Sequence, residues 1–273
     1  MLGGVPIAVS YRPLTGSALV YDPVLDGRHV TFGTSGLLFD NNLVMYDRTS
    51  ESLWSQMMVR GVCGEYISHQ PALLTVTQLS WAAWKEMHPE TTVVSFDTGY
   101  SRNYNVYPYG DYRAIDSTRL LFPLSFSDMR MAPKTLVHGI EHNGIARAYS
   151  LFDIGAQADR RAINDQISGR AVLVVYDRVN AMAMSFDREV RFLKNKGNWK
   201  NKKLTFDVAD DGSGGFALKD RQTRTLWNLQ GEPVAGELVG KVEGDRLQRI
   251  PEAYTAFWFA WAAFHRDTGI HGR

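Results

Sequence analysis

The stretch Asp47-Arg48-Thr49-Ser50-Glu51-Ser52-Leu53-Trp54 has a second copy, Asp220-Arg221-Gln222-Thr223-Arg224-Thr225-Leu226-Trp227. In both copies the Asp stands seven residues before the Trp, and Leu directly precedes the Trp. Five further pairs of matching segments keep the same order: 4–11 with 169–176, 21–22 with 186–187, 31–32 with 205–206, 62–65 with 234–237, and 81–91 with 258–268. Matches in one order along the chain predict an internal duplication.

Short apolar runs between turn signals dominate both halves, which is typical of β-strands. We therefore expect a mainly β (α+β) protein with two tandem, related domains. Each is an antiparallel sheet or partly closed barrel, followed by one aromatic helix that covers its open side. The first repeat spans residues 1–96 with a helix at about 79–88, and the second spans 134–273 with a helix at about 252–265. Asn143-Gly144 predicts a hairpin turn.

Residues 97–133 form a connector that is rich in tyrosine and has no apolar period. We expect it to be irregular and to pack across a domain face, because a run of tyrosine rings is costly to leave exposed. A short strand is expected just before it, at residues 92–96.

Composition excludes several classes of protein. The net charge of +1 argues against binding to nucleic acid or to a membrane surface. No apolar run approaches the roughly 18 residues of a membrane span, and the N-terminal residues have no signal-peptide pattern. Cys63 is the only cysteine, so we expect neither a disulfide within the chain nor a cysteine metal site, and we expect this thiol to be buried. No cofactor is predicted, and the cellular compartment is not set by these features.

The second half carries an insertion. The offset between matching segments grows from 165 to 174 across residues 188–203, an increase of nine (174 − 165). The inserted run is basic, with no acid between Glu189 and Asp207. Such a run suits phosphates or acidic surfaces, and it equally suits a solvated hairpin.

Several segments of the chain resemble the DUF3179 family, a group without an assigned activity. They are residues 4–9, 31–38, 45–48, 52–56, 97–100, 108–110, 227–228 and 257–261. The resemblance implies a His and a Cys-Pro-Leu-Cys-Gly segment, which together suggest a thiol redox or soft-metal centre. This chain has Arg12-Pro13-Leu14-Thr15-Gly16 at that place and starts after the position of the family His. Family descent would supply this thiol redox or soft-metal centre, but we expect this chain to have lost it.

The candidate ligand-binding residues are polar or aromatic and belong to these motifs: Arg12, Thr15, Tyr46, Asp47, Arg48, Tyr100, Arg102, Tyr104 and Tyr109. We expect them to line a cleft between the repeats, without a metal. Each also suits a structural role, such as a repeated ion pair at the Asp-Arg steps or a domain-bridging tyrosine cluster. His88 and His265 stand at matching helix ends, where a capping role suffices.

The leading hypothesis is a non-catalytic member of the family that binds a small polar or anionic ligand, or a protein partner. The rival is an enzyme that uses Tyr46, Asp47 and Arg48 in a concave pocket, with a perturbed carboxylate. A third interpretation is a fragment or a degenerate paralogue without its own activity. The sequence names no substrate.

Overall fold

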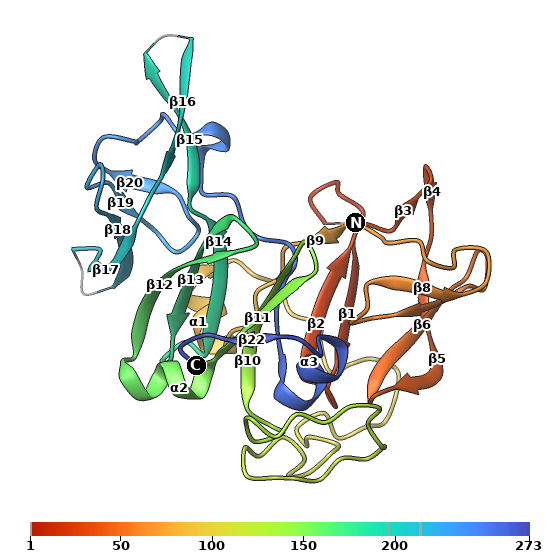
Figure 1. The fold of residues 1–273 in the computed structure, drawn as a ribbon. Helices are drawn as coiled ribbons and strands as arrows, with labels where there is room; N and C mark the ends of the chain where they lie inside the picture. Colours follow the sequence, from red (N-terminus) through yellow and green to blue (C-terminus); the bar gives the residue numbers. More distant parts are fainter. Residues whose placement is uncertain (1, 196, 213–214) are drawn as a thin grey trace.

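The computed structural model describes residues 2–195, 197–212 and 215–273, and over these residues the chain is mainly β with three α-helices (Figure 1). None of the sheets that these residues form closes into a barrel, so the open-sheet alternative holds. None of the helices in this part of the chain has the length and apolar character of a bilayer span. Lys196 of the predicted basic insertion and residues 213–214 of the following hairpin loop lie outside the described residues.

The first half contains a three-stranded sheet, a small hairpin and a four-stranded sheet. The three-stranded sheet has the order β1 (Ala8–Arg12), β2 (Ser17–Tyr21), β9 (Leu73–Leu74), and the hairpin pairs β3 (Val24–Leu25) with β4 (Arg28–His29). The four-stranded sheet is a meander of β5 (Phe32–Phe39), β6 (Asn42–Asp47), β7 (Leu53–Ser55) and β8 (Arg60–Cys63). Helix α1 (Trp81–Met87) follows.

The second half also contains a three-stranded sheet, a hairpin and a four-stranded meander, with additions. The three-stranded sheet has the order β12 (Arg160–Ile167), β13 (Arg170–Asp177), β14 (Met182–Asp187). The hairpin pairs β15 (Glu189–Asn195) with β16 (Asn198–Lys203). The meander consists of β17 (Phe206–Asp210), β18 (Phe216–Asp220), β19 (Leu226–Trp227) and β20 (Pro233–Ala235). A further sheet has the order β21 (Ala253–Phe257), β10 (Leu136–His142), β11 (Ile145–Ser150), β22 (Gly269–Ile270). The helices are α2 (Leu151–Gln157), the 3-10 turn η1 (Glu243–Asp245) and α3 (Trp258–Phe264).

The two copies of the Asp-to-Trp stretch form the same hydrogen-bonded turn. The Nε1 atoms of Trp54 and Trp227 donate to Asp47 Oδ2 and Asp220 Oδ2, both at 3.0 Å. In both copies the residue three positions after the aspartate donates its backbone N–H to the other carboxylate oxygen at 2.6 Å. All four side chains are buried, and a buried carboxylate requires such donors. These equivalent turns agree with the predicted duplication, which itself stays a prediction.

The expected helix boundaries need correction at the second helix. The aromatic run was expected to be helical from about residue 252, but Tyr254 and Phe257 lie in β21, and α3 begins at Trp258. β21 pairs with β10 from Leu136 to Ile140, so a tertiary partner overrides the helical spacing. Helix α2 and strand β12 were not predicted, because residues 151–167 show neither period clearly.

The two aromatic helices do not each cover their own half. α3 packs on β10 and β21 of its own half, and the same core cluster also contains first-half residues such as Leu19 and Trp54. The N-terminus of α1 instead meets the second half, where Ser80 N–H donates to Asn180 O at 3.0 Å. α3 thus contacts both halves and α1 begins against the second half, so the prediction that each helix closes only its own repeat is wrong.

Helix α1 also lacks the cover that α3 has. Trp258 and Trp261 of α3 are 0% exposed, whereas Trp81 and Trp84 of α1 are 52% and 37% exposed. The ring of Trp261 lies on Gly139 of β10 so closely that a Cβ there would be 2.2 Å from it. No described strand packs against α1 in this way, which explains its exposed rings.

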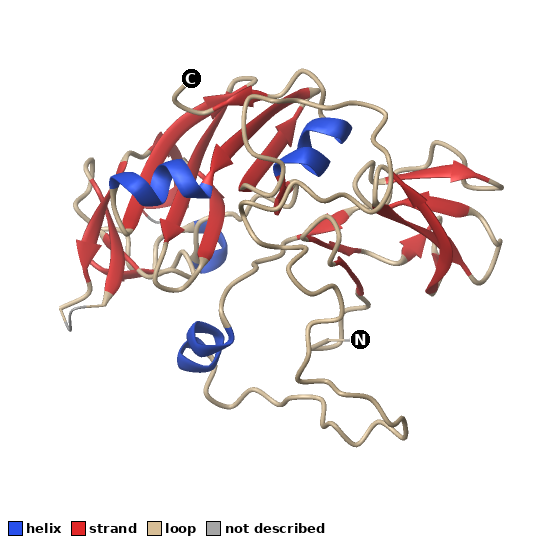
Figure 2. Cartoon of the chain, turned by 90° about the horizontal axis from the view of Figure 1, so that it is seen from below, coloured by secondary structure: helices blue, strands red, loops and turns tan. Residues whose placement is uncertain are grey.

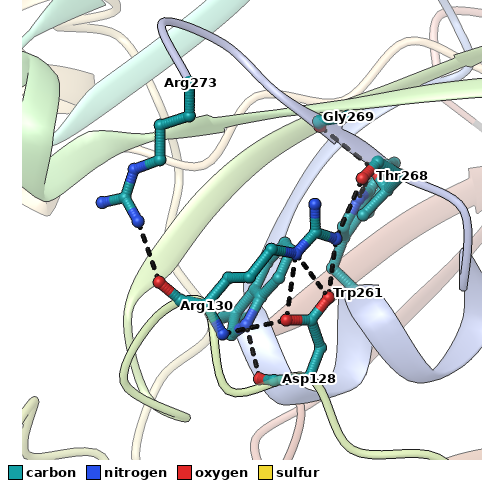
Figure 3. Close-up of polar contacts among 7 residues, drawn as sticks. Asp128, Arg130, Trp261, Thr268, Gly269 and Arg273 are labelled. Atoms are coloured by element: carbon teal, nitrogen blue, oxygen red, sulfur yellow. Dashed lines mark hydrogen bonds and ion pairs between the residues drawn. The ribbon is translucent and has the colours of Figure 1, made fainter.

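The connector is irregular, as Figure 2 shows for this loop-rich side of the molecule. No helix or strand occurs among the described residues between His88 and Thr135, so the strand expected at 92–96 is not formed. Its last part is tied to α3 (Figure 3): Trp258 Nε1 donates to Asp128 O at 2.9 Å, and Arg130 Nη2 donates to Thr268 O at 3.0 Å. Trp261 Nε1 donates to Thr268 Oγ1 at 2.9 Å, so this corner is cross-linked by hydrogen bonds.

Candidate functional site

Asp47 is committed to its own turn. Its carboxylate accepts hydrogen bonds from Trp54, Ser50 and Thr49. Burial opposes its charged form, but these hydrogen bonds outweigh burial and lower the pKa of Asp47 below its usual value. This carboxylate is perturbed, yet it is 0% exposed, so it cannot reach a ligand without opening the turn.

The neighbours of Asp47 point elsewhere. Arg48 is exposed and donates from Nη1 to the carbonyl oxygen of Phe32. The half-buried ring of Tyr46 covers Gly33, where a Cβ would be 2.5 Å from Tyr46 Cε1. The guanidinium of Arg48 is 5.6 Å from the centre of the Tyr46 ring. These three side chains do not converge on one point.

The Arg12–Thr15 segment is the tight connection between β1 and β2. Thr15 is 0% exposed, and its hydroxyl bonds to Ser17 Oγ at 2.8 Å and accepts from Asn42 Nδ2 at 3.0 Å. Arg12 Nε donates to Asn41 O at 3.3 Å. This connection, where the resemblance implies two thiols, thus holds a buried polar network in this chain.

A buried amine lies over this connection. Lys134 is 1% exposed, and its Nζ has no hydrogen-bond partner. This Nζ lies 3.1 Å from the centre of the Tyr112 ring and 4.8 Å from that of Phe259. The Tyr112 hydroxyl donates to Leu14 O at 3.1 Å, which joins the aromatic cage to the connection. Burial lowers the pKa of Lys134 to about 7.

The connector residues form two separate groups. Tyr100, Arg102 and Tyr104 are exposed, and the Tyr104 ring stacks on Phe96 with centres 6.0 Å apart. Tyr109 belongs to the other group and lines a cavity of about 280 Å³ together with Tyr112. The structure therefore does not bring the nine predicted residues together.

A cleft of about 970 Å³ lies between the two halves. Its walls come from residues 57–60 and 70–73 of the first half, and from segments around Glu141, Glu252 and His265 of the second. None of the nine predicted residues is among those that line it. Its volume is at the upper end of the range for sites that enclose a small molecule, about 300–1,000 Å³.

The charged groups of the cleft have both signs. Arg60 and Arg266 contribute positive charge, and Glu141, Glu252 and Asp267 contribute negative charge. Glu252 pairs with Arg170 at 3.4 Å, and Arg266 donates to Ser125 Oγ at 3.3 Å.

Two of these charges are exposed and unengaged. The side chains of Arg60 and Asp267 form no hydrogen bond or ion pair with any described residue. One cation and one anion in the cleft are thus available to a ligand.

A histidine–tyrosine pair stands at the wall of the cleft. His265 Nε2 lies 3.1 Å from the Tyr254 hydroxyl, and the His265 ring packs on Trp261 with centres 4.0 Å apart. Burial lowers the pKa of His265 to about 4, and burial also raises the pKa of Tyr254. Both side chains are therefore neutral at pH 7 and offer hydrogen-bonding groups without charge.

The position of His265 is fixed by the end of α3. Its backbone N–H donates to Trp261 O at 2.9 Å, and Thr268 N–H donates to His265 O at 3.0 Å. Arg130 and Trp261 also donate to Thr268 (Figure 3), so several hydrogen bonds hold the turn that follows His265. The matching His88 caps α1 in the same way, with its N–H 2.8 Å from Trp84 O.

The family assignment rests on nearly the whole chain. The family model described as "Protein of unknown function (DUF3179)" matches residues 1–268. The chain belongs to the DUF3179 family. Comparison with curated proteins and with solved structures gave no significant match.

This DUF3179 member has a single cysteine, Cys63. The connection at Arg12 to Gly16 has no sulfur, and Cys63 is exposed on the edge strand β8. The expectation that Cys63 is buried is wrong, because an edge strand leaves one side open to solvent. No group of three or more His, Cys, Asp or Glu side chains suited to a metal occurs among the described residues.

Only part of the cleft has a signal in the sequence. His265 was expected only as a helix cap, and Tyr254 as part of the same helix. Their pairing requires a strand followed by a helix, which the spacing of eleven residues (265 − 254) does not reveal. Arg60 and Asp267 carry no motif, so only the packing of the two halves brings them into one cleft.

Proposed function

We propose that this chain is a non-catalytic binding protein that holds a small polar ligand of mixed charge in the cleft between its halves. The observation that carries the proposal is the 970 Å³ cleft with charges of both signs beside the neutral His265–Tyr254 pair. The acidic group of such a ligand would meet Arg60 and its basic group would meet Asp267, and neither of these side chains has a partner among the described residues. Apolar side chains such as Met57 and Phe264 supply contact area.

The pKa of His265 and the burial of Asp47 favour binding over catalysis. A general base works best with a pKa near the working pH, whereas the pKa of His265 is lowered to about 4. Asp47, the carboxylate of the rival enzyme hypothesis, is enclosed in its turn. An enzyme in this cleft would therefore need a base other than these two.

We also propose that the two halves descend from one β module, with a connector at about 97–133 between repeats at 1–96 and 134–273. The matching Asp–Trp turns support this proposal. So do the matching helix ends, where Trp84 and Trp261 donate from Nε1 to Thr91 and Thr268 at 3.1 and 2.9 Å.

Thermal unfolding with a panel of amino acids, dipeptides, dicarboxylates and diamines tests the binding function. A ligand at one hundred times its Kd adds about 2.7 kcal/mol, which raises the melting temperature of a chain of this size by about 5 °C. Zwitterionic members should stabilise most, and the double variant Arg60→Ala/Asp267→Asn should lose the effect. Arg102→Ala, an exposed arginine outside the cleft, is the matched control. If no compound in the panel shifts the transition, the proposal fails.

A further inference from the structure

The hairpin of β15 and β16 is more than the fold requires. In the first half, the step from the three-stranded sheet to the meander is made by β3 and β4, two residues each. The equivalent step in the second half uses strands of seven and six residues. The two strands form a separate two-stranded sheet that projects from the body (Figure 1). Because the shorter hairpin serves the same connection, the extra length of β15 and β16 is not required for that connection.

The surface of this hairpin is strongly basic. All six residues of β16 are exposed, and Arg191 of β15 pairs with Glu243 at 2.6 Å. The remaining described lysines of the hairpin form no ion pair with any described residue: Lys194, Lys200, Lys202 and Lys203. The whole chain has a net charge of only +1, so this is a local concentration of unpaired charge.

One edge of the hairpin is open. Within the described part of the chain, β16 pairs with β15 alone. On β15, Leu193 N–H donates away from β16, to Lys241 O at 2.8 Å. Successive residues of a strand point their backbone N–H and C=O groups to opposite edges. The pairs Phe192–Lys200 and Val190–Lys202 therefore carry the hydrogen bonds between β15 and β16.

The backbone groups of Trp199, Asn201 and Lys203 consequently face the open edge. Lys200 and Lys202 lie on one face of β16, about 7 Å apart along the strand. Trp199 lies on the opposite face, 39% exposed, with the Arg191 guanidinium 5.4 Å from its ring centre.

We propose that β16 is a docking edge for an extended acidic segment of a partner protein, which adds as a third strand to β15–β16. Main-chain hydrogen bonds to Trp199, Asn201 and Lys203 would supply affinity, as in other cases of strand addition. An added strand has the same two-residue repeat, so acidic side chains at alternate positions face Lys200 and Lys202. Lysines on an edge strand also prevent unwanted pairing with other strands. That role does not explain why the insertion creates an open strand edge at β16.

Fluorescence anisotropy with a labelled eight-residue peptide of alternating glutamate and valine tests the proposal. The full chain should bind the peptide, with affinity that falls as salt rises. Lys200→Glu/Lys202→Glu should weaken binding at least tenfold. Lys85→Glu/Arg102→Glu makes the same change in net charge at exposed sites elsewhere and should leave binding unchanged.

Asn201→Pro separates strand addition from simple charge attraction. Proline removes the N–H at the open edge, keeps every lysine and leaves the β15–β16 hydrogen bonds in place. Circular dichroism checks that the hairpin persists. Binding should again weaken at least tenfold. Unchanged binding by this variant, no binding at millimolar peptide, or tighter binding to oligothymidine or to anionic phospholipid vesicles would each overturn the proposal.

Discussion

Replacing Lys134 with methionine should stabilise the protein near and below neutral pH. The pKa of Lys134 falls from 10.5 to about 7 on burial, and a difference of about 3.5 units corresponds to about 5 kcal/mol. The ring of Tyr112, 3.1 Å from Nζ, returns about 2 kcal/mol through the cation–π interaction. Methionine has a similar volume and no charge, so we expect Lys134→Met to gain about 3 kcal/mol at pH 6.

The pH dependence has a defined sign. Between about pH 7 and 9.5 the unfolded chain keeps the Lys134 proton and the folded chain releases it. The free energy of unfolding of the unaltered chain should therefore rise with pH across this window. Urea unfolding at pH 6, 7.5 and 9.5 measures this, and the gap to Lys134→Met should narrow towards pH 9.5. A constant gap, or a destabilised variant, would refute the reasoning. Lys85→Met, at an exposed position on α1, is the control.

The remaining predictions concern the two Asp-to-Trp turns, His265 in the cleft, and the packing of α3 on Gly139. Trp54→Phe and Trp227→Phe each remove one donor from a buried aspartate, and each should cost about 1–3 kcal/mol in urea unfolding, by similar amounts. His265 has its pKa lowered from 6.5 to about 4, so stability should fall as the pH drops from 6.5 towards 4, and His265→Gln should remove that part of the acid sensitivity. Gly139→Ala should lower the melting temperature well beyond the effect of Ala146→Gly, since a Cβ at Gly139 would be 2.2 Å from the Trp261 ring.

Local chemistry determined what the sequence could predict. The turn at Asn143-Gly144 forms as expected, with φ values of 51° and 77° that suit a tight hairpin. The Asp47 and Asp220 stretches form buried turns because each carries a carboxylate and its donors within eight residues. Mainly β architecture followed from the same short-range signals.

Long-range packing determined what the sequence could not predict. The helical spacing from Tyr254 to Trp261 is real, but pairing of β21 with β10 draws the first part of it into a strand. α3 packs against residues of both halves, and Asp128 and Arg130 of the connector bind Trp258 and Thr268, contacts that no local pattern reveals. The cleft forms where segments of both halves meet, so its residues carry no motif in the sequence.

The most direct test of the proposed function follows the histidine side chains by NMR during titration with the zwitterionic dipeptide that stabilises the protein most. The account predicts that the His265 imidazole resonances shift with saturation, because His265 lines the cleft. The resonances of His138, whose Nε2 is 2.6 Å from Ser185 Oγ in a buried position outside the cleft wall, should stay unchanged. Stabilisation by the dipeptide without any shift at His265 would contradict the account.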